Sequence, residues 1–261
     1  MKSFKQLMIL IKRIIKQNLT SADTIITVIG TPIFMLLFFV YVFGGNITME
    51  NGQASAKEYL NYSLPGFLLI TMSMGSAYTA LRINMDKNKG FLSRLHSLPI
   101  KRWLVLGSHI SASVIFMILS ELTVFIVGLL MGYRTSTNVT GLLLFIAVSI
   151  LFAFAITLLA IPFSLTAKGF EGADGFSYIL LILLFVSSAL MPMNGMAKPV
   201  KLFAEHQPMT SIVETARNLL DNSSFPLNNS TTVQAFIWLF GIIAIFGFFS
   251  YKRYQKVYSR A

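Results

Sequence analysis

The chain has 261 residues, of which 55% are hydrophobic and only 12% are charged. A soluble domain carries about 25% charged residues, so lipid must accept much of the apolar side-chain surface of this protein. The net charge is +11, and its cations stand in short clusters between long apolar runs, which is typical of membrane topology and not of a nucleic-acid-binding groove.

The N-terminal segment, residues 1–24, is predicted to form an amphipathic helix. Apolar residues recur along one helical face, and cations such as Lys5, Lys12 and Lys16 occupy the opposite face. We expect this helix to lie in the cytoplasmic interface of the membrane, with its cations near anionic headgroups. The alternative is a helix that packs on protein at the soluble side.

Six apolar runs follow, each a candidate for a membrane-spanning helix of about 20 residues. Together they make up a predicted transmembrane domain, residues 25–250, and they are too long and continuous for strands of a β-barrel. The fifth run is short, ends at Met191-Pro192 and is the least secure. The predicted spans are Ile25–Phe43, Tyr62–Leu81, Leu104–Met131, Gly141–Phe163, Phe176–Met191 and Val233–Ser250.

The positions of lysine and arginine predict the orientation of the spans. With six spans, both termini lie on one side of the membrane, and that side receives most of the 21 Lys and Arg residues. They cluster in the N-terminal segment, in the connection 82–103 and in a basic tail, residues 251–261. The sequence therefore predicts a multi-pass protein with both termini in the cytoplasm.

The longest predicted outer connection is residues 192–232, before the last span. Prolines interrupt its first part, and a helical pattern runs from Ser211 to Leu220. Two structures remain open for it. One is a helical hairpin that re-enters the membrane, where protein or a water-filled cavity must cover its backbone. The other is a folded external cap.

Enzyme motifs are absent from the sequence. There is no phosphate-binding loop of the form G-x-x-x-x-G-K-[ST], no HExxH zinc motif and no nucleophile elbow. Cysteine is also absent, which excludes disulfides and thiolate chemistry. The three histidines, His96, His109 and His206, lie at different levels of the predicted topology. We therefore expect no catalytic site, no metal site and no cofactor on this chain, and no nucleic-acid partner.

The cytoplasmic connection contains a predicted short helix that begins after Gly90. Phe91, Leu95 and Leu98 share one side of this helix, and basic residues flank both of its ends. A short amphipathic helix between two spans fits a groove on a soluble partner. An ordinary charged loop at the membrane surface explains the same pattern equally well.

Glu121 is an acidic residue inside the third predicted span. A carboxylate at this depth is costly and faces protein or water rather than lipid. We expect it to be protonated or hydrogen-bonded to Ser120, to Thr123 or to a residue on another helix, which favours a structural role. A proton or cation site is the alternative.

The second predicted span combines small residues with methionine and tyrosine. Ser73 and Ala77, spaced four residues apart, let helices approach closely. Met72, Met74 and Tyr78 offer adaptable apolar contacts of the kind that suits varied ligands. Simple helix packing explains each of these positions as well.

Four segments of the chain read, in order, TPIFMLLFFVYVFGG, GFLSRLHSLPIKRW, ALMPMNGM and HQPMTSIVETARNLL. In this order they resemble the ABC-2 type permease family, the membrane subunits of a class of ATP-binding-cassette exporters. The second segment is similar to the family's Gly-x-x-x-x-Leu-x-x-x-Pro coupling segment, and the fourth to its outer Pro-x-[ST] and Arg element. Many relatives carry an acidic pair before the coupling glycine, whereas this chain has Asp86, Lys87 and Lys89.

The resemblance implies an all-α fold like that of type V exporters, with six transmembrane helices, an N-terminal interfacial helix, a coupling helix and an outer hairpin. It also implies an assembly of two permeases, identical or siblings, with two ABC ATPase subunits that bind the ATP and Mg. The implied ATPase-coupling residues are Gly90, Phe91, Leu92, Arg94, Leu95, Leu98 and Pro99. The second and fifth spans are implied to form the translocation pathway, with Met72, Met74, Tyr78, Phe185, Ser188 and Met191, and an outer gate at Pro192 and Met193.

We therefore expect a permease subunit in a bacterial cytoplasmic membrane, in contact with lipids, that moves an amphipathic or hydrophobic substrate outward. Drugs, antimicrobial peptides and lipids are the expected substrate classes. One alternative is a permease for polysaccharide or lipid-linked glycan. Others are a carrier driven by an ion gradient without an ATPase, and a membrane scaffold or immunity factor that transports nothing.

Overall fold

The computed structural model describes residues 2–45, 48–49, 52–53, 55–97, 100–221 and 229–258. Most of these residues are helical; one small antiparallel hairpin and several turns, such as residues 186–190, are not. The elements, in chain order, are α1 (Lys2–Thr20), α2 (Ala22–Ile25), η1 (Ile26–Gly30), α3 (Thr31–Phe38), η2 (Phe39–Phe43), β1 (Thr48–Met49), β2 (Gly52–Gln53), α4 (Ala56–Asn88), α5 (Phe91–His96), α6 (Arg102–Leu130), α7 (Val139–Thr166), α8 (Phe170–Phe185), η3 (Met193–Gly195), α9 (Lys198–His206), α10 (Pro208–Asp221) and α11 (Ser230–Tyr258).

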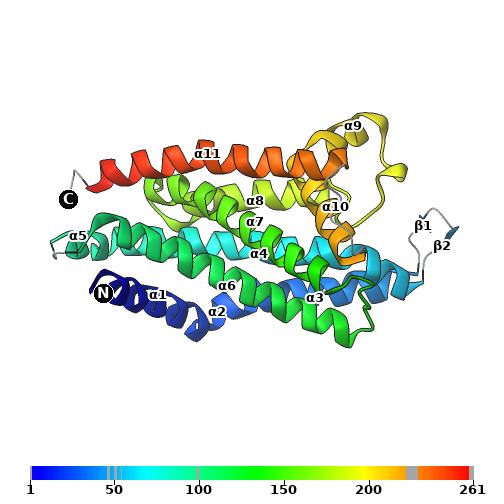
Figure 1. The fold of residues 1–261 in the computed structure, drawn as a ribbon, viewed down its shortest axis with the longest axis horizontal. Coiled ribbons are helices and arrows are strands. Elements are labelled where there is room, and N and C mark those ends of the chain that lie inside the picture. The colour runs from blue at the N-terminus through cyan, green and yellow to red at the C-terminus, as the bar shows by residue number, and fades with distance from the viewer. Residues whose placement is uncertain are drawn as a thin grey trace.

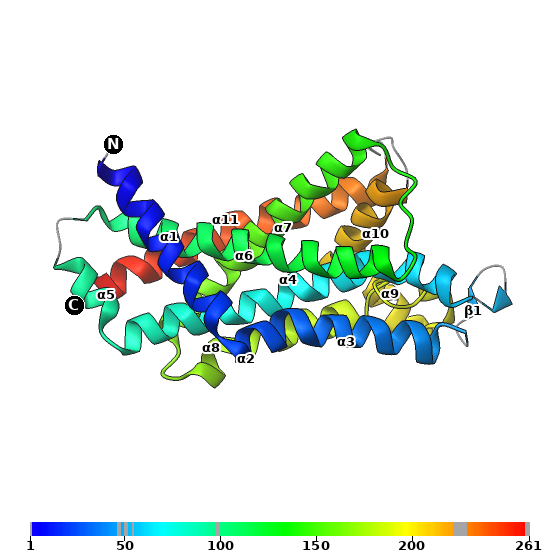
Figure 2. The ribbon, with the colours of Figure 1, turned by 90° about the horizontal axis from the view of Figure 1, so that it is seen from below.

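The long helices lie side by side in an elongated bundle (Figure 1). The short helix α5 and the two ends of the chain lie at one end of the bundle, which we call the terminal end. The helices α9 and α10 and the hairpin β1–β2 lie at the opposite end, which we call the outer end. Figure 2 shows the same separation from a second direction.

Five described segments are long and apolar enough to cross a membrane. They coincide with five of the six predicted spans, and the protein is thus a multi-pass, all-α membrane protein in outline. The candidate spans are Ala22–Phe43, Ala56–Asn88, Trp103–Leu130, Val139–Thr166 and Ser230–Val257. The first is a continuous helix in which the π-helical turn η1 precedes Pro32. Because proline has no N–H to donate to the preceding turn, a wider turn there accommodates its ring.

The predicted fifth span, Phe176–Met191, is wrong at its C-terminal end. Helix α8 has 16 residues and ends at Phe185, and residues 186–190 form turns. The hydroxyl of Ser187 donates to the carbonyl of Leu184 at 2.6 Å and accepts from the amide of Ala189 at 3.0 Å. Such local side-chain bonds compete with the helical ladder, so the apolar sequence leaves the helix before Met191.

The last helix extends beyond Ser250, the end of the last predicted span, into the segment predicted as a basic tail. Helix α11 has 29 residues and continues to Tyr258, well beyond Ser250. At 1.5 Å per residue it is about 44 Å long, which exceeds the roughly 30 Å of a hydrocarbon core. The first residues assigned to the tail therefore form the last turns of this helix at the terminal end (Figure 1).

Helix α4 forms the centre of the bundle and contacts α6, α7, α8 and α10. Most of its side chains are buried, including the polar residues Ser63, Thr71 and Ser76. Each of these three hydroxyls donates to a backbone carbonyl three or four residues earlier. Their polar groups are thereby satisfied inside the helix, which explains why a polar sequence can occupy the core of a membrane protein.

The N-terminal helix α1 has two apolar strips. One strip, with Ile11 and Ile14, is buried against Ala112 of α6. The other, with Phe4, Met8 and Leu19, remains exposed. The predicted amphipathic helix is present, and it packs on protein while it leaves a second apolar strip uncovered. Figure 2 shows it crossing the bundle obliquely at the terminal end.

Candidate functional site

The short helix α5 is attached to the terminal end of the bundle. Gly90 adopts a left-handed conformation with φ of +68°, which lets the chain reverse direction between α4 and α5. Leu92 and Leu95 are then buried in a cluster with Ile83 of α4 and Val105 of α6. Helix α5 is therefore packed on several long helices and is not a free loop.

The outward side of α5 is polar. Ser93, Arg94 and Ser97 are exposed, and Nη2 of Arg94 donates to the carbonyl of Lys89 at 3.2 Å. The side chain of Leu95, one of the residues expected to take part in coupling, packs inside this chain. A helix of six residues has too few turns for the sequence pattern to decide between its two apolar sides. Leu98 and Pro99, also assigned to coupling, lie outside the described residues.

Arg13 of α1 connects three elements of the terminal end. Its guanidinium donates two hydrogen bonds to the carboxylate of Asp86 on α4, at 2.9 and 2.8 Å. The same guanidinium lies 3.7 Å from the centroid of the Phe91 ring at the start of α5. Nε2 of His109 on α6 lies 3.5 Å from Asp86. The acid before the coupling glycine is thus paired within this chain.

A second arginine reinforces the attachment of α1 to α4. Nε of Arg82 donates to Asn18 at 2.8 Å, and its Nη2 donates to the carbonyl of Gln17 and the hydroxyl of Thr24. Bonds from one charged, planar group to several acceptors fix the relative position of two helices better than a single contact. Helix α1 and the start of the first span are therefore attached to α4 at several points.

The C-terminal end of α4, where Arg82 and Asp86 lie, also holds the connection between α7 and α8. Nδ2 of Asn84 donates to the carbonyls of Ser164 and Ala167, and Nζ of Lys87 donates to Ala167 at 3.1 Å. Nδ2 of Asn88 donates to the carbonyl of Lys168 at 3.0 Å. The terminal end thus consists of α1, α4, α5 and the α7–α8 connection in one hydrogen-bonded unit.

The residues expected to line a pathway fall into two groups. Met72 is wholly buried, and Tyr78 is buried with its hydroxyl donating to Asp23 at 2.8 Å. Their burial by other helices of this chain speaks against their facing a second subunit in this conformation. Met74 is half-buried and Ser188 is buried. Phe185 and Met191, at the end of α8 and just after it, are exposed, so these two alone of the set present their side chains on the surface.

At the outer end, Arg217 of α10 holds the turn after α8 against α4. Its Nη2 donates to the carbonyl of Ser188 at 2.7 Å, and its Nε donates to the carbonyl of Tyr62 at 3.1 Å. The Tyr62 hydroxyl donates to the same Ser188 carbonyl at 3.0 Å, and the guanidinium lies 3.9 Å from the Tyr62 ring centroid. We call Tyr62, Ser188 and Arg217 the outer clamp. Arg217 enters the sequence-based predictions only within a family-like segment and without an assigned role, although an arginine in an apolar helical pattern is a signal for one.

The outer clamp lies where α4 and the turn after α8 come closest. A Cβ atom at Gly66 would lie 2.4 Å from the carbonyl oxygen of Ala189, so only glycine fits there. The residues expected at the outer gate, Pro192 and Met193, follow this turn and are half-buried. Helix α10, which confirms the predicted helical stretch, supplies the arginine. The structure therefore places three of the four family-like segments at this end of the bundle.

Glu121 lies buried between α6 and α7. The hydroxyl of Ser149 on α7 donates to its Oε1 at 2.8 Å. This is the expected hydrogen bond to a residue on another helix. Within the part of the chain that the structure describes, no group of three or more His, Cys, Asp or Glu side chains is placed to hold a metal ion.

Comparison with known proteins gives a consistent result. The family model of the ABC-2 type transporter matches residues 5–220. The chain is 27% identical over 201 residues to the "Daunorubicin resistance ABC transporter permease protein DrrB1" of Streptomyces coeruleorubidus, which covers 77% of this chain and 69% of that protein. It is 24% identical over 222 residues to the "Probable doxorubicin resistance ABC transporter permease protein DrrC" of Mycobacterium tuberculosis, covering 84% and 78%. A protein named as a transport permease, ycf38, of Cyanophora paradoxa is 28% identical over 235 residues, covering 87% and 78%.

Proposed function

We propose that this chain, which belongs to the ABC-2 type transporter family, is the permease subunit of an exporter whose ATP is hydrolysed by a separate ATPase. The observation that carries the proposal is the attachment of α5. Leu92 and Leu95 pack this helix on the bundle, while Ser93 and Arg94 leave its other side free to meet a soluble partner.

In the proposed mechanism, closure of a pair of ATPase subunits displaces α5. Phe91 lies under Arg13, and Arg13 is paired with Asp86, so the displacement passes to α1 and to the central helix α4. Helices packed in this way move as rigid bodies. ATP supplies the direction of transport, because it binds the closed state of the ATPase pair better than the open state.

We further propose that the chain crosses the membrane six times and keeps both termini in the cytoplasm. Helix α8 is the additional crossing, since it starts beside the terminal end of α4 and ends beside the outer helix α10. Its 16 residues span about 24 Å, and the turns 186–190 extend it. The cations of α1, α5 and the end of α11 then all lie on the cytoplasmic side.

A second permease, a copy or a sibling, is proposed to pack against the exposed side of α8. Tyr178, Ile179, Ile182 and Phe185 leave a row of large apolar side chains uncovered there. An amphipathic or hydrophobic substrate would pass between the two subunits along this row and Met191. The names of the relatives, which refer to resistance against daunorubicin and doxorubicin, support this substrate class.

The outer clamp is proposed to keep the outer end closed until the substrate arrives. Arg217 and Tyr62 both bond the carbonyl of Ser188, which immediately precedes the segment expected to form the gate. Release of the substrate requires this turn to move away from α4. The clamp and α5 lie at opposite ends of α4, so this one helix connects ATPase movement to the gate.

The test is ATP-dependent transport by the permease co-expressed with candidate ATPase subunits from the same genome. Inside-out vesicles that hold both proteins should accumulate daunorubicin when ATP is added. Arg94→Glu reverses the charge on the outward side of α5 and should lower this transport at least about tenfold while membrane insertion persists. Lys57→Glu, on an exposed residue of the outer end, is the matched charge reversal and should transport at the parental rate. Purified permease that moves daunorubicin without any ATPase would contradict the proposal.

A further inference from the structure

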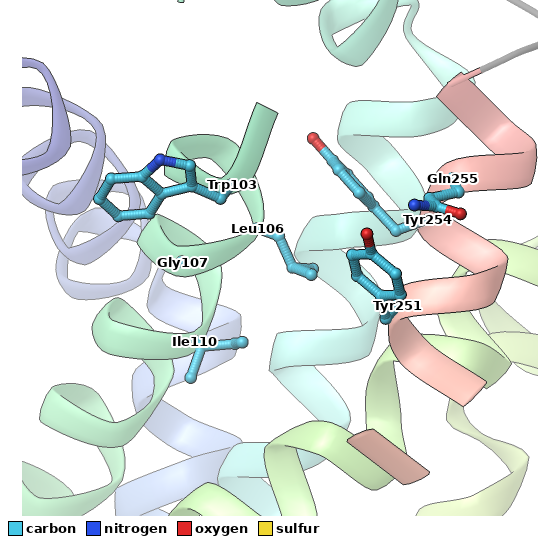
Figure 3. A pocket seen from close by; sticks show the side chains of 7 residues that line it. All are labelled: Trp103, Leu106, Gly107, Ile110, Tyr251, Tyr254 and Gln255. Carbon is cyan, nitrogen blue, oxygen red and sulfur yellow. The ribbon is translucent and has the colours of Figure 1, made fainter. Parts of the chain in front are cut away.

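Two apolar hollows join to form a groove along α6, away from α8. The first, of about 440 Å³, lies between α6 and α11 and is lined by Trp103, Gly107 and Ile110 on one side and by Tyr251 and Gln255 on the other. Figure 3 shows Leu106 of α6 and the two tyrosines of α11 directed toward the space between these helices. The second hollow, of about 530 Å³, lies between α6 and α7 and shares Ile110 with the first.

The length of this groove matches one leaflet of a bilayer. Along α6 it extends from Trp103 to Ile115, which is about 18 Å at 1.5 Å per residue. Half of a hydrocarbon core is about 15 Å. The deep part is lined by Val114, Ile150 and Phe154, while the part near the terminal end has aromatic residues with polar groups. Trp and Tyr occupy the headgroup level of membranes, so the groove has the polarity gradient of a single lipid molecule.

Two cations lie near the polar end of the groove. Lys101 immediately precedes α6, and Lys252 follows the lining residue Tyr251 on α11; both are exposed. The sequence of α11 contains no acid, and α6 contains none before Glu121. Cations at this depth between transmembrane helices attract anionic headgroups.

We propose that the groove binds one acyl chain of an anionic phospholipid from the leaflet at the terminal end, with its headgroup between Lys101 and Lys252. The site is separate from the proposed substrate path, because α6, α7 and α11 form it while the exposed pathway residues lie on and after α8. A lipid held there would connect the start of α6 to the end of α11 and so influence the terminal end, where α5 is attached.

The two tryptophans of the chain provide the test. Trp103 lines the groove, and Trp238 lies on α11 near the outer end, where it is exposed. Trp238→Phe leaves Trp103 as the only reporter, and Trp103→Phe leaves only Trp238 as its control. Each variant is reconstituted in phosphatidylcholine vesicles to which brominated phosphatidylglycerol or brominated phosphatidylcholine is added. Quenching of tryptophan fluorescence then measures how strongly each lipid occupies the site next to the reporter.

We expect Trp103 to be quenched by the anionic lipid with an affinity about fivefold or more above that for the neutral lipid, since one nearby cation contributes about this factor. Trp238 should show almost no preference. Lys101→Gln with Lys252→Gln should reduce the preference at Trp103 toward one. Gly107→Leu should fill the groove and weaken quenching by both lipids. Gly107→Ala should leave it intact, because its Cβ would lie 3.8 Å from Trp103.

Three results would overturn the proposal. The first is equal quenching of Trp103 by the two lipids. The second is the same anionic preference at Trp238, which would indicate general attraction to the protein surface. The third is a preference at Trp103 that survives both Gly107→Leu and the removal of the two cations Lys101 and Lys252. Trp238→Phe, the variant that carries the Trp103 reporter, keeps every lining residue of the groove, so the first result does not depend on the folding of the groove variants.

Discussion

The guanidinium of Arg13 and the carboxylate of Asp86 are joined by two parallel hydrogen bonds, although the residues are 73 positions apart in the sequence. Arg13 belongs to the amphipathic helix at the N-terminus, and Asp86 belongs to the last turn of the central helix. Phe91, the first residue of α5, lies against the same guanidinium. This one side chain therefore connects α1, the central helix α4 and α5, the helix proposed to meet the ATPase.

Replacement of Arg13 by lysine should destabilise this junction. Lysine keeps the charge but offers neither the bidentate geometry nor the planar surface for Phe91. We expect a loss of about 1–3 kcal/mol, the range for hydrogen bonds to charged groups. Thermal unfolding in detergent measures it. Arg13→Asp combined with Asp86→Arg should recover part of the loss, and two single variants that behave like the parent would show that the pair is not important.

Gly66→Ala should disturb the contact between α4 and the turn after α8. The added Cβ would lie 2.4 Å from the carbonyl oxygen of Ala189, so the turn must move. Overpacking of this kind costs about 1–3 kcal/mol. Gly241→Ala is the matched control, because Gly241 is also helical and has nothing within 4 Å of the added atom. Equal unfolding temperatures for the two variants would mean that the close approach is relaxed without cost.

Arg217→Gln should open the outer clamp. A single amide cannot reach the carbonyls of both Tyr62 and Ser188 and has no charge to place over the Tyr62 ring. The chain has no cysteine, so Met191→Cys alone reports on the exposure of this region. We expect Arg217→Gln to raise the labelling rate of this cysteine by a membrane-impermeant maleimide in intact cells. Arg134→Gln, on an exposed arginine that donates only to backbone carbonyls nearby, should leave the rate unchanged.

A conflicting result at the clamp is easily recognised. If Met191→Cys reacts at the same rate with and without Arg217, the arginine does not hold the turn in place. The same two variants also distinguish a role of Arg217 in closing the outer end from a role in the stability of the fold. A variant that unfolds earlier in detergent but labels at the parental rate in cells would assign Arg217 a purely structural role.

Glu121→Gln should be tolerated. The glutamine carbonyl can still accept the hydrogen bond from Ser149, and a neutral side chain costs less inside a membrane than a carboxylate. We expect unchanged thermal stability and ATP-dependent transport within about twofold of the parent at pH 6 and pH 8. Loss of transport by a stably folded Glu121→Gln would instead support the alternative of a proton or cation site.

The long helices were predictable from the sequence because spans such as Gly141–Phe163 are continuous apolar runs, and a bilayer imposes a minimum length on them. The end of α8 was not predictable in the same way. Residues 186–190 are as apolar as the helix before them, and it is the hydroxyl of Ser187 that ends the helix by bonding locally. Hydropathy measures the environment of a residue and carries no information about its backbone hydrogen bonds.

The candidate site likewise has features that the sequence predicts and features that it does not. The glycine before α5 and the basic residues around it predicted the position of this helix. They did not predict which side of it faces the bundle. Leu92 is buried in the core cluster and Phe91 only packs against it, because the arrangement of α4, α6 and α11 decides which side is covered. The partnership of Arg13 with Asp86 depends on the fold as a whole. Pairing between residues so far apart cannot be derived from one sequence without its structure.

The most direct test of the account is a cross-link from α5 to the ATPase. Arg94→Cys, which is the only cysteine of its chain, is coupled to a photoreactive maleimide and irradiated in membranes that contain candidate ATPase subunits. We predict an adduct of permease and ATPase whose yield changes when ATP is added, and no such adduct from Lys57→Cys at the outer end. Cross-linking of the ATPase from Lys57→Cys but not from Arg94→Cys would contradict the orientation and the coupling role of α5 together.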